Sequence, residues 1–301
     1  MKIILAVSGG VDSVCMLHAW KNNPSFLDIT ENINYAKTEV IVAHFDHGIR
    51  DDSSADALFV QALAEKYDYS FVSGRGDLMH DTSEATARKA RFVFLRSLLE
   101  NHDDRIATAH HFDDKRETQI INLIRGTNRK GLSVLQNKNQ IIRPLINKTK
   151  LEIYEYASKN NLEWVEDSTN QSDDYLRNRL RRNVMPTITD DKKLWTTIDN
   201  VDRINTQVDP LLEELAKNVL VNKNTIKREL YRRLPVLIRL NILQLIYTEL
   251  LNETSEKQRL SKARLVQLDD WICDSSKNHK RDIAGKIVVD LADNSVTLKA
   301  K

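Results

Sequence analysis

The chain has 301 residues, enough for two domains of ordinary size, and its 41% apolar and 29% charged residues are typical of a globular protein. The formal net charge of +2 is too small to indicate a nucleic-acid partner by itself, so such a partner must be argued from local basic clusters. No apolar run approaches the length of a membrane span, and Ile3–Val7 is too short for a signal peptide, so we expect a cytoplasmic protein without membrane contact.

In the first half of the chain, short β-branched runs alternate with helical patterns. The predicted strands are Ile3–Val7, Glu39–Phe45, Tyr69–Val72, Arg105–Ala109 and Gln140–Arg143. Between and after them, Ser83–Leu99 and Lys148–Asn160 carry apolar residues at helical spacing, which predicts amphipathic helices. This alternation is typical of an α/β domain in which helices cover both faces of a parallel sheet.

The pattern changes after Pro186. Apolar residues from Leu194 to Leu215 keep a helical spacing, in which Pro210 must kink or break the helix. The later elements are two helical stretches, Leu230 to Ile246 and Leu265 to Ile272, and two β-like runs, Lys286–Leu291 and Ser295–Lys299, around an Asp293-Asn294 turn. We therefore predict a catalytic domain over residues 1–189 and a smaller, mainly helical domain over residues 190–301 with a terminal β-hairpin.

The six residues Ser8-Gly9-Gly10-Val11-Asp12-Ser13 lie between the first predicted strand and a helix. Paired glycines let the backbone approach a ligand closely, the helix N-terminus presents unpaired N–H groups to an anion, and the serines add hydroxyl donors. Asp12 would repel a phosphate unless a cation lay between them, and magnesium binds carboxylate and phosphate oxygens together. The segment therefore predicts a phosphate loop, and the alternative is a simple glycine turn with a helix cap.

Two further segments carry basic side chains on predicted helices. Glu84, Arg88 and Arg91 are spaced to share one helix face, which we expect to lie opposite the apolar stripe of that helix. Four more guanidinium groups follow within six residues, at Arg177, Arg179, Arg181 and Arg182. On a helix, Arg177 and Arg181 share one face while Arg179 and Arg182 share another, so one face can turn toward a nucleotide and the other toward nucleic-acid phosphates. The alternative for both segments is a solvated helix surface.

Two segments after predicted strands gather histidines and carboxylates, namely Ala43–Arg50 and Thr108–Thr118. In the second segment, His110, Asp114 and Glu117 lie close to one helix face, and His111 and Asp113 are their neighbours. So many titratable side chains are hard to explain as core, and they indicate a site at the carboxyl ends of the strands. The alternative is that Asp113 and Asp114 only complement the helix dipole.

These segments together resemble the tRNA(Ile)-lysidine synthetase family, a branch of the N-type ATP pyrophosphatases, in order and spacing over residues 3–186. The loop Ser8–Ser13 is similar to the pyrophosphate loop of the superfamily. The segments AHxxHxxR, AHHxDDxxET and RNRxR are, as a set, similar to this branch. Two residues depart from the family pattern, since Asp46 stands where Asn is usual and Lys115 where Gln is usual.

The resemblance implies a ligase that uses ATP to adenylylate the C2 carbonyl oxygen of the wobble cytidine in an isoleucine tRNA with a CAU anticodon. The ε-amine of free L-lysine then displaces AMP and leaves lysidine. The implied sites are ATP at Ser8, Gly9, Gly10, Val11, Asp12 and Ser13; Mg²⁺ at Asp12 and Asp114; tRNA at Arg177, Arg179, Arg181 and Arg182; the triphosphate or cytidine at Arg88 or Arg91; and cytidine, lysine and metal around His110, Asp113, Asp114 and Glu117. The resemblance leaves open whether the protein forms a homodimer.

Three other functions are alternatives. A metal-dependent phosphohydrolase would use the histidines and aspartates as ligands, but it leaves Ser8–Ser13 unexplained. A tRNA thiolase of the same superfamily needs reactive cysteines, and Cys15 and Cys273 lie far apart, outside every motif and in no CxxC pair. A non-enzymatic RNA-binding protein would gain nothing from Asp12, which only weakens phosphate binding when no metal is bound.

Overall fold

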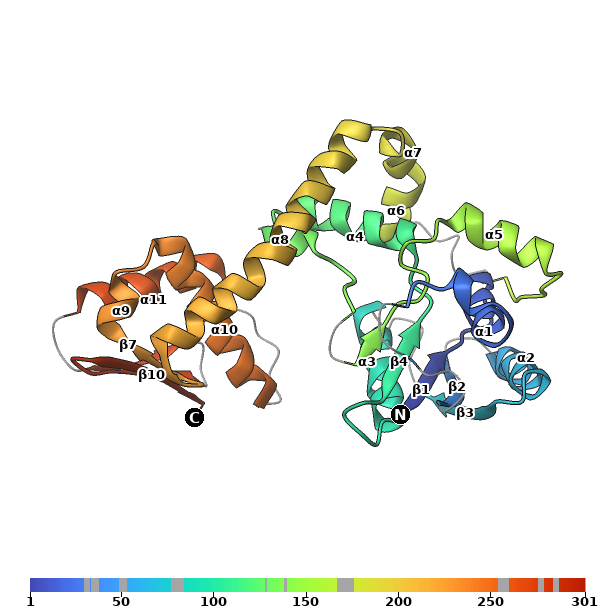
Figure 1. Cartoon of the computed structure of the whole chain (residues 1–301), viewed down its shortest axis with the longest axis horizontal. Helices are drawn as coiled ribbons and strands as arrows, with labels where there is room; N and C mark the ends of the chain where they lie inside the picture. The colour runs from blue at the N-terminus through green and yellow to red at the C-terminus, as the bar shows by residue number, and fades with distance from the viewer. Residues whose placement is uncertain are drawn as a thin grey trace. The chain divides into compact units, whose positions relative to one another are not determined.

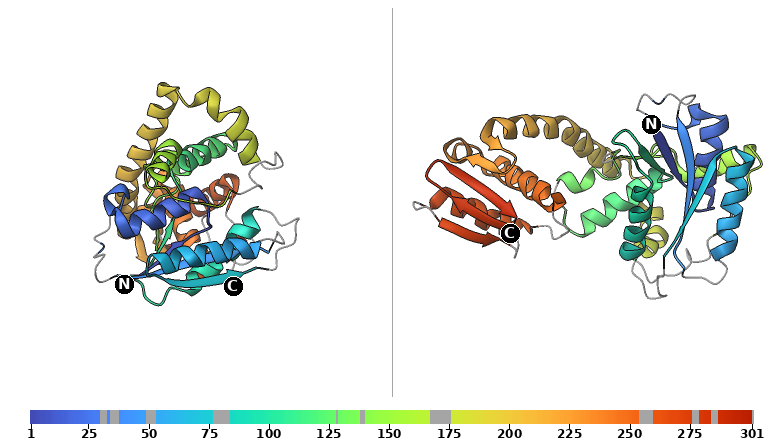
Figure 2. Two further views of the ribbon diagram at one scale, coloured as in Figure 1. Left: turned by 90° about the vertical axis from the view of Figure 1, so that its right-hand side faces the viewer. Right: turned by 90° about the horizontal axis from the view of Figure 1, so that it is seen from below.

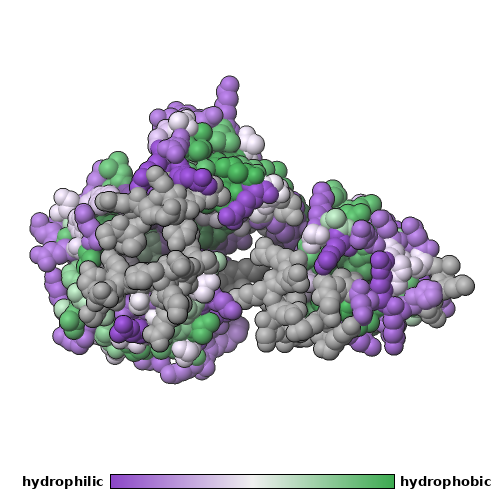
Figure 3. All heavy atoms as spheres, turned by 180° about the vertical axis from the view of Figure 1, so that it is seen from behind, coloured by the Kyte–Doolittle hydropathy of each residue, from purple (hydrophilic) through white to green (hydrophobic). Residues whose placement is uncertain are grey.

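The computed structural model describes residues 1–29, 33, 38–48, 53–76, 84–127, 129–137, 140–166, 176–253, 260–275, 279–283 and 287–300. The chain forms two compact units, Met1–Asp202 and Arg203–Lys301, each with its own sheet and apolar core (Figure 1). Hydrophilic and hydrophobic side chains are interspersed over the face of each unit that Figure 3 shows. Within the described ranges, no helix is both long and apolar enough to cross a membrane.

The first unit is built on a five-stranded parallel sheet in the order β3-β2-β1-β4-β5, which confirms the predicted α/β fold. Its strands are β1 (Lys2–Ala6), β2 (Glu39–Asp46), β3 (Ser70–Arg75), β4 (Arg105–Thr108) and β5 (Ile141–Ile142). After β3 the chain crosses to the other side of β1 to form β4. The connections therefore diverge between the carboxyl ends of β1 and β4, which is where open α/β sheets bind ligands.

Helices cover both faces of this sheet, as the sequence predicts (Figure 2). Because alternate side chains of a strand point to opposite faces, Ile3 and Leu5 of β1 lie in one core and Ile4 lies in the other. The helices α1 (Val11–Asn22), α2 (Ser53–Lys66) and α5 (Lys150–Lys159) pack on the face of Ile3, and α3 (Glu84–Ser97) packs through Leu95 on the face of Ile4. The short 3₁₀ helices Pro24–Phe26 and Arg129–Leu132 lie in the connections.

A further group of helices carries much of the site and shares a small core of Ile120, Leu180 and Ile198. It contains α4 (Phe112–Ile124), α6 (Leu176–Asn183), α7 (Met185–Ile188) and the first turns of α8 (Lys192–Val219). The guanidinium of Arg116 lies 4.6 Å from the ring centres of both Phe112 and Trp195 and donates hydrogen bonds of 2.7 and 2.8 Å to Asp199. These contacts fix the start of α8 on α4.

Helix α8 begins in the first unit and ends in the second. It continues through Pro210 as one helix of 28 residues, so of the two outcomes predicted for this proline the break does not occur. The missing N–H removes one hydrogen bond, and the bonds and packing on either side maintain the helix. The division into a catalytic domain over residues 1–189 and a second domain over residues 190–301 stays a prediction, because the compact units are defined by contacts and not by function.

The second unit combines helices with a five-stranded antiparallel sheet in the order β6-β7-β10-β9-β8. Its elements are β6 (Leu220–Asn222), β7 (Thr225–Lys227), α9 (Arg228–Arg232), α10 (Val236–Glu253), α11 (Lys262–Asp274), β8 (His279–Ile283), β9 (Ile287–Leu291) and β10 (Ser295–Ala300). The predicted terminal hairpin is present as β9 and β10, with Val296 opposite Leu291. Pro235 divides the stretch predicted as one helix into α9 and α10, because a residue before proline disfavours the helical conformation.

The contact between α4 and α8 predicts a stability effect. Arg116 is buried and lowers the pKa of Asp199, whose side chain is 51% exposed. Asp199→Asn should therefore destabilise the first unit by about 1–2 kcal/mol, between the values for surface and buried ion pairs. Urea unfolding followed by tryptophan fluorescence measures the change. Glu213→Gln, an exposed carboxylate of the same helix, should leave the midpoint unchanged, and equal midpoints for both variants would contradict the effect.

Candidate active site

A cavity of about 400 Å³ lies at the carboxyl ends of β1, β2 and β4, at the point where the connections diverge. Each of the three strands contributes to its lining, through Ala6 of β1, Ala43 of β2 and Thr108 of β4. The polar residues around it are Ser8, Gly10, Asp12, Ser13, His44, Asp46, His47, Asp56, Arg91, His110 and Asp114. The phosphate loop and the histidine–carboxylate segment, which lie a hundred residues apart, therefore line one cavity.

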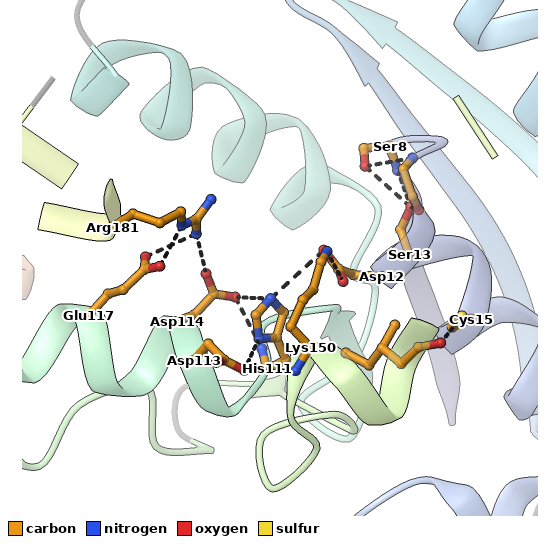
Figure 4. A network of polar contacts seen from close by, with 12 residues as sticks. Ser8, Asp12, Ser13, Cys15, His111, Asp113, Asp114, Glu117, Lys150 and Arg181 are labelled. Carbon is orange, nitrogen blue, oxygen red and sulfur yellow. Dashed lines mark hydrogen bonds and ion pairs between the residues drawn. The ribbon is translucent and has the colours of Figure 1, made fainter. Parts of the chain in front are cut away.

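The loop Ser8–Ser13 is held together by the hydroxyl of Ser13, which is buried (Figure 4). This oxygen accepts the N–H groups of Ser8 and Gly9 at 3.1 and 3.2 Å and donates to the carbonyl of Gly10 at 2.9 Å. Gly9 has φ +96°, a conformation that side-chain-bearing residues rarely adopt. The glycine is therefore required by the turn itself, and helix α1 begins directly after Gly10.

Asp12 lies in the first turn of α1 and lies close to a lysine and a histidine from elsewhere in the chain. Its Oδ1 accepts a hydrogen bond from Lys150 Nζ at 2.6 Å, and its Oδ2 lies 3.9 Å from His111 Nε2. Lys150 is the first residue of α5, and its backbone N–H donates to Asp113 Oδ2 at 2.8 Å. The starts of α1, α4 and α5 therefore meet through three ionic side chains.

The pKa values of the adjacent histidines His110 and His111 are shifted in opposite directions. Burial lowers the pKa of His110 to about 3, with help from nearby guanidinium groups. Arg88 lies 3.3 Å from its Nε2, which must accept, so Nδ1–H donates to Thr108 Oγ1 at 2.9 Å. Burial also lowers the pKa of His111, but the carboxylates of Asp113, Asp114 and Asp12 outweigh burial and raise it.

Two carboxylates of α4, Asp114 and Glu117, are paired with Arg177 and Arg181 of α6, and Figure 4 shows the contacts of Arg181. Arg177 donates to Asp114 at 2.9 Å and to Glu117 at 3.1 Å, and Arg181 donates to both oxygens of Glu117 at 2.5 and 3.0 Å. The Glu117 side chain is only 3% exposed. Burial raises the pKa of Asp114, but His111 and Arg177 outweigh it, so that the pKa is lowered.

The predicted arginine faces of α6 are separated as expected. Arg177 and Arg181 turn toward α4, and the side chains of Arg179 and Arg182 are exposed. On α3, however, the expectation of opposite faces is wrong. Arg91 and the buried Leu95 line the same cavity, because positions four apart on a helix share a side and Leu95 extends the apolar stripe toward the arginines.

Several residues differ in placement from the sequence predictions. Asp113 is absent from the cavity wall and contacts Lys150 and His111. Asp46, which departs from the family pattern, accepts the N–H of Gly48 at 2.7 Å and so holds the turn after β2. Lys115, the other departure, donates to Asp202 of α8 at 2.9 Å. Arg50 and the side chains of Glu84 and Asn178 lie outside what the structure describes.

Lys150 is the residue that sequence reasoning missed. It lies in the predicted helix Lys148–Asn160 but in none of the segments proposed to carry chemistry, and a lysine at a helix start carries no signal of its own. The only available hint was its position seven residues after Arg143, which ends a predicted strand.

The carboxylates present fit a magnesium ion. Asp12 and Asp114 both line the cavity, come from different elements and lie within 4 Å of the same His111 nitrogen. Among the described residues no three His, Cys, Asp or Glu side chains are arranged to hold a metal by themselves. Magnesium is usually bound by one or two carboxylates together with substrate phosphates, so two carboxylates beside a phosphate loop are sufficient.

His110 provides a prediction for pH dependence. Its pKa of about 3 lies below the ordinary 6.5, so the folded protein should keep this imidazole neutral between pH 5 and 8. Below about pH 6.5 the unfolded chain takes up a proton there that the folded chain does not, so folding stability should fall toward pH 3. Histidine-selective NMR, with His110→Gln to assign the signal, measures this. Titration of the assigned signal near pH 6.5 would contradict the prediction.

Comparison with known proteins supports the predicted resemblance. The chain is similar to the Bifunctional protein TilS/HprT of Listeria innocua, with 34% identity over 242 residues, 75% of this chain and 35% of that protein. It is also similar to the tRNA(Ile)-lysidine synthase of Petrotoga mobilis, with 34% identity over 193 residues, 62% of this chain and 59% of that protein. The chain thus spans roughly a third to three fifths of the length of these relatives.

Among solved structures, the U34-tRNA thiolase NcsA of Methanococcus maripaludis, determined with its [4Fe-4S] cluster, has a TM-score of 0.52 and 18% identity over 69% of this chain and 72% of that chain. At this identity the likeness shows the fold alone. The family model described as the PP-loop domain matches residues 1–188, which contain the cavity, the phosphate loop and both arginine faces of α6. The chain therefore belongs to the PP-loop domain family.

Proposed function

We propose that this chain is a ligase that joins L-lysine to C2 of the wobble cytidine in an isoleucine tRNA with a CAU anticodon. ATP first adenylylates the cytidine C2 oxygen and releases pyrophosphate. The ε-amine of lysine then attacks C2 and releases AMP. The similarity to tRNA(Ile)-lysidine synthases over 62% of the chain supports the reaction class, and the cavity supports the nucleotide chemistry.

The observation that carries this proposal is a pair of carboxylates in the first turns of α4, namely Asp114 in the cavity wall with the phosphate loop and Glu117 three residues further along the helix. Both are largely buried, and buried carboxylates require cationic partners. In this structure the guanidinium groups of Arg177 and Arg181 are the cationic partners of these carboxylates. The lysine ε-ammonium is a cation that Glu117 can hold in exchange for part of its arginine contacts, because Asp114 is assigned to the metal. A carboxylate there can also take the proton that the ammonium must lose before it attacks.

The phosphate loop has a separate task, which is to hold the leaving pyrophosphate. The N-terminus of α1 presents N–H groups to the phosphates. Asp12 and Asp114 would hold Mg²⁺, which supplies positive charge that stabilises the charge developing on the phosphates. Arg91 lines the same cavity and offers a guanidinium to the triphosphate or to the cytidine.

The geometry gives less support to the alternative functions. Burial raises the pKa of the Cys15 thiol to about 12, and Cys273 lies in the other unit, so the chain lacks the reactive thiolate that a thiolase would need. A phosphohydrolase with a metal cage of histidines and aspartates is not favoured either. Among the described histidines, His44 donates to the carbonyl of Val7 at 3.0 Å, and His110 is directed at Thr108 and Arg88.

The proposed reaction can be tested by nucleoside mass spectrometry on unmodified isoleucine tRNA incubated with the protein, ATP, Mg²⁺ and lysine. We expect lysidine and one pyrophosphate for each tRNA modified. With lysine omitted, tRNA-dependent pyrophosphate exchange should persist, because activation precedes amine attack. Asp12→Ala should abolish pyrophosphate release and leave tRNA affinity within about twofold, since Asp12 serves the metal. Full turnover of this variant, or a product that requires a sulfur donor, would refute the proposal.

The two faces of α6 predict two classes of variant. Arg179→Ala and Arg182→Ala should each reduce the salt dependence of tRNA binding by about one unit of slope, because an exposed arginine on a phosphate releases one counterion. Arg177→Ala and Arg181→Ala should keep that slope and lower kcat, because Asp114 and Glu117 lose the contacts that position them. Filter-binding assays across a salt series and steady-state kinetics separate the classes. If all four variants keep the wild-type salt slope and the wild-type kinetics, the arginines of α6 have no role in tRNA binding or catalysis.

A further inference from the structure

Lys150 contacts Asp12, the carboxylate that the proposed function assigns to magnesium. Its ammonium donates to Asp12 Oδ1 at 2.6 Å, so it lies in direct contact with this oxygen (Figure 4). The other oxygen of Asp12 faces His111 at 3.9 Å. A divalent ion that bound Oδ1 would meet the ammonium at contact distance, and two cations repel each other there. One of them must leave.

The backbone of Lys150 is held in place, while its side chain, whose Nζ also lies 5.1 Å from the centre of the Tyr154 ring, is partly exposed. Its N–H donates to Asp113 of α4, and Thr149 caps α5 by accepting the N–H of Glu152. Ile153, one turn further along, is fully buried against α1, where the Cys15 thiol donates to its carbonyl at 3.5 Å. The Lys150 side chain, in contrast, is 35% exposed. A lysine ammonium on such an anchored stem is a point charge that can turn between neighbouring anions.

We propose that Lys150 is a built-in counter-ion of Asp12 that competes with free divalent cations and yields to the cation only when nucleotide phosphates are present. This inference rests on the proposed function, which makes Asp12 a magnesium ligand. Without nucleotide, a metal at Asp12 has to displace the ammonium and leave it beside the metal's positive charge. With nucleotide, the phosphates supply negative charge that the displaced ammonium can face. Metal and nucleotide binding are thereby coupled.

The test is Mn²⁺ binding to the full chain, measured by electron paramagnetic resonance of the free ion with and without ATP. Without ATP, Lys150→Met and Lys150→Gln should bind Mn²⁺ at least about tenfold more tightly than the wild type, within the usual range of coupling between sites. Lys150→Arg should resemble the wild type, because the positive charge is kept. Lys148→Met is the matched control, since the Lys148 ammonium lies over the Phe26 ring at 4.8 Å. The gain should vanish in Asp12→Asn/Lys150→Met and shrink when ATP is present.

The outcomes separate the inference from the proposed function. If Lys150→Met and Lys150→Gln fold and bind Mn²⁺ as weakly as the wild type without ATP, while Asp12→Asn weakens Mn²⁺ binding in the presence of ATP, the counter-ion inference is overturned and the magnesium assignment stands. If Asp12→Asn leaves Mn²⁺ binding unchanged with ATP, Asp12 is not a metal ligand and both fall. Circular dichroism melting confirms that each variant is folded.

Discussion

The candidate active site depends on one electrostatic constraint, the burial of negative charge at the start of α4. Asp114 and Glu117 are removed from water, and a buried carboxylate is tolerated only where cations and N–H groups surround it. Arg177 and Arg181 meet this need from α6, and His111 meets it from the N-terminal end of α4. Helix α6 therefore has to lie against α4, although it follows α4 by about fifty residues in sequence.

On its other side, α4 forms a second set of ion pairs, in which the signs of the charges on the two helices are reversed. There the helix contributes the cations, Lys115 and Arg116, and α8 contributes the carboxylates, Asp202 and Asp199. Neighbouring positions of one helix thus face different partners, because a helix distributes consecutive side chains around its axis. The positions of Asp114 and Glu117 therefore depend on the contacts that α4 makes with both α6 and α8. A change in α8 can consequently alter the site without touching the cavity.

The parts of this structure that follow repeating patterns could be predicted from the sequence, and the parts that depend on contacts between distant segments could not. Strand β1 and the loop after it are local features, and both lie where Ile3–Val7 and Ser8–Ser13 place them. The strands β6 and β7 have only three residues each, and β8 carries His279, Lys280 and Arg281, so none has an alternating apolar pattern to detect. The ion pair of Asp12 with Lys150 joins residues 138 apart, which no local pattern reveals.

The hydroxyl of Ser13 has a consequence for how the phosphate loop is prepared. It accepts the N–H groups of Ser8 and Gly9, which would otherwise be donors without acceptors at the end of β1. A side chain of the protein therefore stands in for an anion and keeps the turn in one conformation before any nucleotide arrives. Binding then becomes an exchange of acceptors within a rigid frame, and the entropy loss of ordering a loop is already included in the free energy of folding.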